Sequence, residues 1–164
     1  MELREFKDVF DRFYHPVKNF LYYKLGDVAL AEDLVQEVFL KTWEKRDSIR
    51  LETVKSLLYT IASNLANNHY TSARARFEFE LKENLDHSTQ ENPQYLLENT
   101  EFKARLEKAL ADLPENQRTV FLMSRMDDLT YTEIAERLEI SVKAVEKRMH
   151  EALVFLRNVL DQKI

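Results

Sequence analysis

The stretch from Thr53 to Phe77 contains no acidic side chain, although Asp, Glu, Lys and Arg make up 32% of the chain. At helical spacing, one side of this stretch presents hydroxyl, amide, phenol and guanidinium groups: Ser56, Tyr59, Ser63, Asn67, Tyr70 and Arg74, with Lys55, Asn64 and Arg76 nearby. In nucleic-acid interfaces, cations contact phosphates, amides bind base edges, and aromatic rings stack on unpaired bases. The pattern therefore indicates a surface for nucleic acid. The alternative is a solvated polar face whose tyrosines are half buried.

A second candidate site is a short helix, a turn and a longer helix near the end of the chain. Thr130 and Glu133 have the spacing of a capping box, and Ser141 can cap the second helix after a turn at 139–141. The inward side of the second helix is apolar: Val142, Val145, Met149, Ala152, Leu153 and Leu156. Its outward side carries Lys143, Ala144, Lys147, His150 and Glu151, with Arg148 at the margin. Two lysines one turn apart suit a recognition helix in the major groove of DNA, although short helical hairpins are also common without that function.

A third candidate surface lies on a predicted helix from about Ala31 to Lys45. Apolar residues recur along one side of it at about 100° per residue: Ala31, Leu34, Val35, Val38, Phe39 and Thr42. The opposite side carries Asp33, Gln36, Glu37, Leu40 and Glu44. Leu40 is therefore an apolar residue on an acidic face. This indicates a docking patch for a partner or, alternatively, one of the scattered leucines that are normal on protein surfaces.

The composition restricts the chemistry that these surfaces can support. The 164 residues include one Gly and three Pro, which argues against a glycine-rich phosphate loop, a dinucleotide-binding turn or a run of tight hairpins. The chain has no Cys and its four His are scattered, so neither a thiolate site nor a histidine metal motif is indicated. We expect no catalytic site, no metal and no cofactor.

The elements that position these surfaces are helices, because apolar residues recur at spacings of three and four. The first predicted helix covers 3–21 and is interrupted or kinked by Pro16, and a break follows at Gly26. The helix at 31–45 and a third helix with an apolar stripe from Val54 to Leu65 close a small bundle. Two further helices, ending before Pro114 and at Asp127, precede the hairpin. The predicted fold class is all-α, with two small helical domains.

The segment 77–103 separates these domains. It has two basic and seven acidic residues and therefore holds nearly all of the net charge of −5. Its apolar periodicity is weak, so we predict an acidic linker between domains at 1–76 and 104–164. No apolar stretch approaches the roughly 18 residues of a membrane span, and the charged segment Glu2 to Lys7 is unlike a signal peptide. We therefore expect a cytoplasmic protein without membrane insertion.

Five segments, taken together, resemble a known family in order and spacing. They are AEDLVQEVFLKTW at 31–43, LYTIASNL at 58–65, LPENQRTVF at 113–121, LTYTEIAERL at 129–138 and SVKAVEKR at 141–148. The family is that of the extracytoplasmic function sigma factors, the short two-domain members of the bacterial sigma-70 family. The resemblance spans nearly the whole chain except the linker. One departure is Glu139, which stands where the turn of the family usually has Gly, so a residue with a Cβ must adopt that conformation or the turn is built differently.

The resemblance implies a role for each candidate surface. The face with Asp33, Gln36, Glu37 and Leu40 would dock on the clamp coiled coil of core RNA polymerase. The loop Arg46 to Leu51 and the third helix would hold the melted −10 promoter element, through Arg46, Ser56, Tyr59, Ser63, Asn64, Asn67, Tyr70 and Arg74. The hairpin would read the −35 element as duplex, through Ser141, Lys143, Ala144, Lys147 and Arg148. Such factors are commonly held by an anti-sigma factor.

The sequence therefore predicts a non-enzymatic transcription initiation factor that lends promoter recognition and strand opening to RNA polymerase. The main alternative is a stand-alone helix-turn-helix regulator whose N-terminal bundle dimerises or senses a ligand. A helical hydrolase or metal enzyme is disfavoured, because acidic pairs such as Glu32 with Asp33 lack convergent histidines. A protein-binding adaptor is the remaining possibility.

Overall fold

The computed structural model describes residues 1–69 and 93–160, and these ranges are helical apart from short connections. The N-terminal unit comprises α1 (Leu3–Leu25), α2 (Val28–Glu44), the 3₁₀ turn η1 (Arg46–Ser48) and α3 (Val54–Asn68). The C-terminal unit comprises α5 (Pro93–Asp112), α6 (Glu115–Arg125), α7 (Tyr131–Leu138) and α8 (Val142–Leu160). The all-helical, two-region fold is thereby confirmed. None of the described helices is long and apolar enough to cross a membrane.

The first helix is set by its two ends. Glu2 and Glu5 form a capping box at its start, and Gly26 ends it in the left-handed conformation, with φ of 70°, while donating its N–H to the Tyr22 carbonyl. The predicted break at Gly26 is confirmed. Pro16 does not interrupt the helix, because α1 continues through it as one element to Leu25.

The start of α5 corrects the boundary of the predicted linker. Residues 93–103 were expected to belong to that linker, whereas the helix begins at Pro93. Proline is favoured at the first helical position, because its fixed φ suits a helix and its missing N–H costs no hydrogen bond there. The following residues include strong helix formers such as Leu, Glu, Lys and Ala. The rest of the predicted linker, 77–92, lies outside the described residues.

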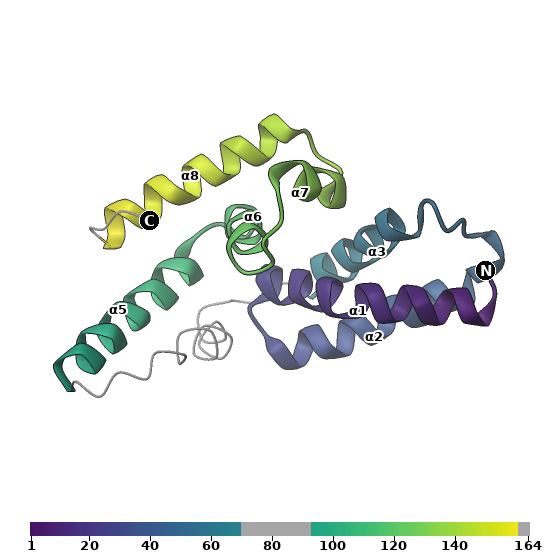
Figure 1. Ribbon diagram of the computed structural model, residues 1–164, viewed down its shortest axis with the longest axis horizontal. Coiled ribbons are helices and arrows are strands. Elements are labelled where there is room, and N and C mark those ends of the chain that lie inside the picture. Colours follow the sequence, from purple (N-terminus) through teal and green to yellow (C-terminus); the bar gives the residue numbers. More distant parts are fainter. Residues whose placement is uncertain (70–92, 161–164) are drawn as a thin grey trace.

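The two units pack against each other through one continuous apolar core. In the N-terminal bundle α1 contributes Val17, Phe20 and Leu21, which pack with buried residues of α2 and α3. In Figure 1, α6 lies against α1 and α7 lies beside α3, in agreement with the contacts between these pairs of helices. We call this packing of α6 on α1 and of α7 on α3 the closed arrangement.

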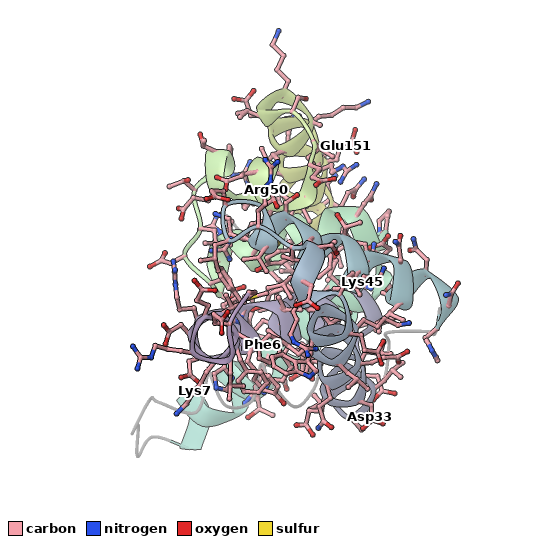
Figure 2. All side chains as sticks on the ribbon, turned by 90° about the vertical axis from the view of Figure 1, so that its right-hand side faces the viewer. Phe6, Lys7, Asp33, Lys45, Arg50 and Glu151 are labelled. Atoms are coloured by element: carbon pink, nitrogen blue, oxygen red, sulfur yellow. The ribbon has the colours of Figure 1, made fainter. Side chains whose placement is uncertain are left out.

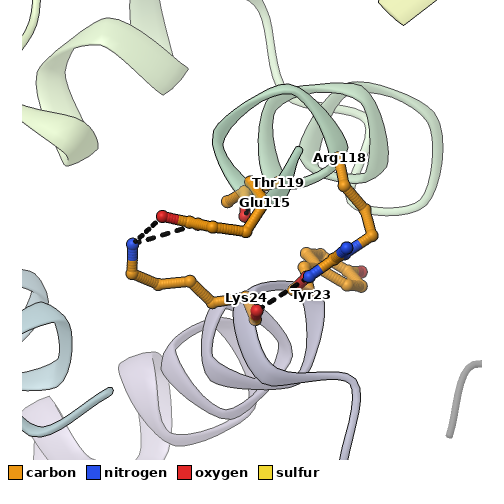
Figure 3. A network of polar contacts seen from close by, with 5 residues as sticks. All are labelled: Tyr23, Lys24, Glu115, Arg118 and Thr119. Atoms are coloured by element: carbon orange, nitrogen blue, oxygen red, sulfur yellow. Dashed lines mark hydrogen bonds and ion pairs between the residues drawn. The ribbon is translucent and has the colours of Figure 1, made fainter. Parts of the chain in front are cut away.

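A buried arginine joins the two units (Figure 3). The side chain of Arg118 on α6 is 4% exposed, and its guanidinium donates to the carbonyls of Tyr23 at 2.9 Å, Lys24 at 2.9 Å and Leu113 at 3.1 Å. Tyr23 and Lys24 lie in the last turn of α1, where carbonyls have no helical N–H partner. A cation at this end is also favoured by the helix dipole. Arg118 therefore acts as a C-cap for α1 that is supplied by the other unit.

Two further polar contacts surround this arginine. The Lys24 ammonium lies 2.9 Å from the Glu115 carboxylate in the first turn of α6. The Asp127 carboxylate accepts hydrogen bonds from the Tyr23 hydroxyl at 2.6 Å and the Asn19 amide at 3.2 Å. Burial raises the pKa of Asp127 above its usual value, although both hydrogen bonds oppose that shift. The end of α1 is thus bound by α6 and by the loop that follows it.

The helix-turn-helix forms as the local signals predict. Thr130 and Glu133 make the capping box of α7, and the Ala144 N–H donates to the Ser141 hydroxyl at 3.0 Å at the start of α8. Glu139 ends α7 with φ of 56° and ψ of 44°. A residue with a Cβ therefore does take the left-handed conformation that Gly adopts more easily.

Replacing Arg118 with Ala should destabilise the protein. The Tyr23 and Lys24 carbonyls would lose their donor in a buried interface, so the free energy of unfolding should fall by about 3 kcal/mol. Urea denaturation measures the loss, and small-angle scattering should show a larger radius of gyration. Arg125→Ala is the matched control, because Arg125 lies on the same helix but is exposed. An Arg118→Ala protein as stable and compact as the wild type would contradict the assignment.

Candidate nucleic-acid and partner interfaces

The predicted nucleic-acid face of α3 is only partly accessible in the closed arrangement. Asn64 and Asn67 are exposed, whereas Ser56 and Ser63 are half-buried. Tyr70 and Arg74 lie outside the described residues. The open part of the face is therefore its C-terminal half, and the N-terminal half faces α7.

Tyr59 does not lie on the accessible face, which corrects the sequence-based prediction. Its side chain is 1% exposed, its ring packs edge-on against Phe20 with 5.3 Å between ring centroids, and its hydroxyl accepts a hydrogen bond from Arg137 at 3.2 Å. Burial raises the pKa of Tyr59 to about 12, against the opposing effect of the Arg137 guanidinium. The sequence carried a signal for this, because the small apolar residues Ala62 and Ala66 stand three and seven positions beyond Tyr59, on the same side of the helix. The structure shows that both are buried.

Polar side chains of α7 and the following turn cover the N-terminal half of α3. Lys55 forms an ion pair with Glu136 at 2.6 Å, and the Ser56 hydroxyl donates to the carboxylate of Glu139. Both contacts involve groups that the sequence assigns to the neighbourhood of nucleic acid. The closed arrangement thus places acidic side chains where the prediction places a phosphodiester strand.

A cavity of about 450 Å³ lies between the loop after η1 and the start of α3. Its lining residues are Lys45, Ser48, Ile49, Thr53, Ser56, Leu57, Thr60 and Glu139. Aliphatic and hydroxyl side chains with one lysine offer both apolar walls and hydrogen-bonding groups. The sequence predicted the loop as part of this site but did not single out Thr53, Leu57 and Thr60. Leu57 and Thr60 lie with Ser56 on one face of α3, and Thr53, three residues before Ser56, is the N-cap of that helix.

Arg46, the predicted contact in this loop, is held by its neighbours. Its guanidinium lies 3.9 Å from the centroid of the Trp43 ring and donates to the Trp43 carbonyl at 2.9 Å. The Met1 ammonium donates to the Arg46 carbonyl at 3.0 Å. Cation–π stacking fixes one face of the guanidinium, and the half-buried side chain keeps part of its surface accessible.

The predicted docking face of α2 is accessible. Leu40 is 58% exposed, Asp33 and Gln36 are exposed, and Glu37 is half-buried. Behind Leu40, the ring of Phe39 packs against Phe6 and Phe10 with centroid separations of 6.3 and 4.9 Å. In Figure 2, Asp33 near the start of α2 lies at the lower right, and Arg50 in the loop before α3 lies in the upper half of the view.

The candidate recognition helix α8 presents its polar side as predicted. Ser141, Lys143 and Lys147 are exposed, whereas Ala144 and Arg148 are half-buried. Val142 was expected to face inward, but it is 38% exposed because it stands at the first helical position, before the packed turn that begins at Val145. The structure therefore brings the two lysines together on one open face.

Two family models match the chain. Residues 9–76 match Sigma-70 region 2, and residues 103–156 match Sigma-70, region 4. The RNA polymerase sigma factor YlaC of Bacillus subtilis (strain 168) is 28% identical over 154 residues, which cover 92% of this chain and 89% of that protein. The ECF RNA polymerase sigma-E factor of Haemophilus influenzae is 31% identical over 136 residues, which cover 77% of this chain and 72% of that protein.

A solved structure shares the fold. The sigma factor RpoE from Bartonella quintana, in complex with the anti-sigma factor NepR, superposes with a TM-score of 0.62 and 22% identity, over 97% of this chain and 98% of that chain. The agreement in fold extends over both helical units.

Titration of Tyr59 tests the closed packing of α7 on α3. With its pKa raised to about 12, this phenol should ionise well above the ordinary tyrosine value of about 10. The stabilisation from burying neutral Tyr59 is fully present below about pH 10 and should be lost as the pH rises through about 12. Tyrosinate absorbance should show this late component in the wild type and in Tyr14→Phe, but not in Tyr59→Phe. Identical alkaline titrations of all three proteins would contradict the burial of Tyr59.

Proposed function

Because the chain belongs to the sigma-70 family as an extracytoplasmic function RNA polymerase sigma factor that directs transcription initiation, we propose that its two helical units divide promoter recognition between them. The N-terminal unit, within 1–76, docks on core RNA polymerase and holds the opened −10 element. The C-terminal unit, with its helix-turn-helix within 104–164, reads the −35 element, and the segment between α3 and α5 connects the two units. The protein acts in the cytoplasm, where the polymerase and promoters are, and it catalyses no reaction itself.

The docking surface is the outer face of α2. Leu40 is an exposed apolar residue surrounded by Asp33, Gln36 and Glu37, which supports a contact with a partly basic, partly apolar helix surface on the polymerase. The aromatic packing behind Phe39 fixes this face in advance. Binding therefore requires little reorganisation of the sigma factor.

The single observation that carries the strand-opening role is the cavity beside the acid-free helix α3. Its volume of about 450 Å³ lies within the range of pockets that hold small ligands, and its walls combine Ile49 and Leu57 with hydroxyl groups and Lys45. An unpaired nucleotide needs such a combination, because its base requires apolar contact and edge hydrogen bonds while its phosphate requires a cation. Arg46, Ser63, Asn64 and Asn67 extend this surface along the strand, and Tyr70 and Arg74, which belong to the same prediction, lie outside the described residues.

The duplex-reading surface is the open side of α8. Lys143 and Lys147 are suited to phosphates or to the acceptor atoms of guanine, and Ser141, Ala144 and Arg148 complete the face. Two promoter elements about two helical turns apart are separated by roughly 70 Å. The closed arrangement holds α6 against α1 and α7 against α3, and we propose that the units separate when the factor binds the polymerase.

Regulation by an anti-sigma factor is part of the proposal. The fold shared with RpoE, a structure solved in complex with NepR, supports a partner that binds and retains the factor when its genes are not needed. Such a partner would act by keeping the α2 face, the α3 face or both from polymerase and DNA.

Core polymerase should convert weak DNA binding into promoter opening. Permanganate footprinting should detect unpaired thymines at a cognate promoter with the wild-type factor plus core enzyme, and none with the factor alone. Leu40→Glu should abolish these signals and reduce association with core polymerase by about 2 kcal/mol, while changing the free energy of unfolding by only about 0.5 kcal/mol. Val159→Glu, which makes a similar apolar-to-acidic change at an exposed position near the end of α8, controls for a general effect of added negative charge.

Tight, sequence-specific binding by the protein alone, with no opening when polymerase is supplied, would instead favour a stand-alone helix-turn-helix regulator. Loss of thermal stability in Leu40→Glu would show that this residue contributes to the core and not to docking.

Lys147→Ala should weaken recognition of the −35 element. The loss should be about 1 to 3 kcal/mol and confined to the preferred sequence if the lysine contacts a base, and spread evenly over sequences if it contacts phosphate. Binding of holoenzyme to cognate and scrambled −35 duplexes separates the two cases, with Lys108→Ala on α5 as an exposed lysine control. Unchanged binding to every duplex would remove Lys147 from the interface.

A further inference from the structure

Glu139 has a left-handed backbone conformation and a side-chain contact with the other unit, and neither feature requires the other. It ends α7 in a left-handed backbone conformation, with φ of 56°, and its carboxylate accepts a hydrogen bond from Ser56 on α3. The two residues are 83 positions apart in the chain, so the contact forms only when the units pack together. Glu139 also lines the cavity between the loop and α3.

The backbone of the turn does not explain why this residue is a glutamate. Gly or Asn adopts a positive φ more easily than Glu does, because the Cβ and the longer side chain of Glu crowd the backbone. The side chain, by contrast, has a specific partner in Ser56. The acidic group thus contributes to the contact between units and not to the turn itself.

The neighbouring contacts have the same chemical character. Glu136, one turn before Glu139, pairs with Lys55 at 2.6 Å, so two carboxylates of the C-terminal unit meet one cation and one hydroxyl of α3. Phosphate oxygens would use the same donors. The edge formed by Glu136 and Glu139 and a single-stranded DNA backbone therefore compete for one set of groups.

We propose that Glu139 is an internal competitor of the promoter strand, which holds Ser56 at the wall of the cavity in the free factor and is withdrawn when core polymerase separates the two units. This inference rests on the proposed binding of unpaired DNA by α3. It adds a specific residue that lowers the affinity of the free protein for that DNA.

Arg118 is not part of this competition, because it binds α1 at the other contact between the units. Its removal would release the whole C-terminal unit, whereas removal of the Glu139 carboxylate should weaken only the packing of α7 on α3. Variants at position 139 are therefore the sharper test.

The experiment compares Glu139→Gly and Glu139→Asn with the wild type. Both substitutes tolerate positive φ and lack the carboxylate, so the turn is preserved. With the free full-length proteins and a short fluorescent single-stranded DNA of mixed sequence, anisotropy should show dissociation constants lowered roughly three- to tenfold, which corresponds to the net value of one typical hydrogen bond. With each protein assembled on core polymerase, the dissociation constants should equal that of the wild-type holoenzyme.

Asp128→Asn is the matched control. Asp128 is exposed, has φ of 58° and stands at the opposite end of α7, so the substitution makes the same change of charge in the same backbone conformation. Separation of α7 from α3 is followed independently by energy transfer between dyes on Asn68→Cys and Thr132→Cys, since the chain has no other cysteine and both positions are exposed. The Glu139 variants should show reduced transfer and Asp128→Asn should not.

Equal affinities of the free wild type and both Glu139 variants would overturn the proposal, as would an equal gain in Asp128→Asn or in the holoenzymes. A general effect of negative charge on DNA binding would explain the latter two results. Failure of the proposed function is seen separately, because wild-type holoenzyme would then leave promoter thymines unreactive to permanganate.

Discussion

A buried guanidinium must have its donors satisfied, and in this protein the carbonyls that satisfy Arg118 belong largely to another unit. The last turn of α1 has carbonyls without helical partners, and Arg118 of α6 supplies the missing donors. Each side therefore completes the other: α1 gains a C-cap, and the arginine gains hydrogen bonds that compensate for its desolvation. The placement of α7 beside α3 follows from this joint, because α6, its following loop and α7 are consecutive in the chain.

The contacts between the two units reduce access to the proposed DNA-binding face of α3. The contacts that close the units cover Lys55, Ser56 and Tyr59, which belong to the part of α3 nearest the cavity. Most of the covering contacts are polar and partly exposed, and such contacts contribute little free energy individually. A partner with a large interface, such as core polymerase, can therefore replace them. In the proposed open arrangement, groups of DNA take the place of these polar contacts to α3.

Features that depend on neighbouring residues could be predicted from the sequence, whereas contacts between residues far apart in the chain could not. The capping box at Thr130, the Ser141 cap and the break at Gly26 depend on residues within four positions, and all are confirmed. Tyr59 was assigned to the wrong environment because the residue that covers it, Arg137, is 78 positions away. Arg118 likewise gave no local signal, since its acceptors on α1 lie 94 and 95 positions earlier. The roles of the site residues themselves remain predictions that rest on their chemistry and on the family.

The open face of α2 has a consequence for the order of assembly. Leu40 is accessible in the closed arrangement, with 58% of its surface exposed. In the proposed division of roles, docking on the polymerase therefore needs no prior rearrangement, whereas capture of the promoter strand does. A factor built in this way meets the enzyme first and DNA second, so unbound copies do not occupy promoters unproductively. The order of binding thus depends on accessibility, because the α2 face is open in the closed arrangement and part of the α3 face is covered.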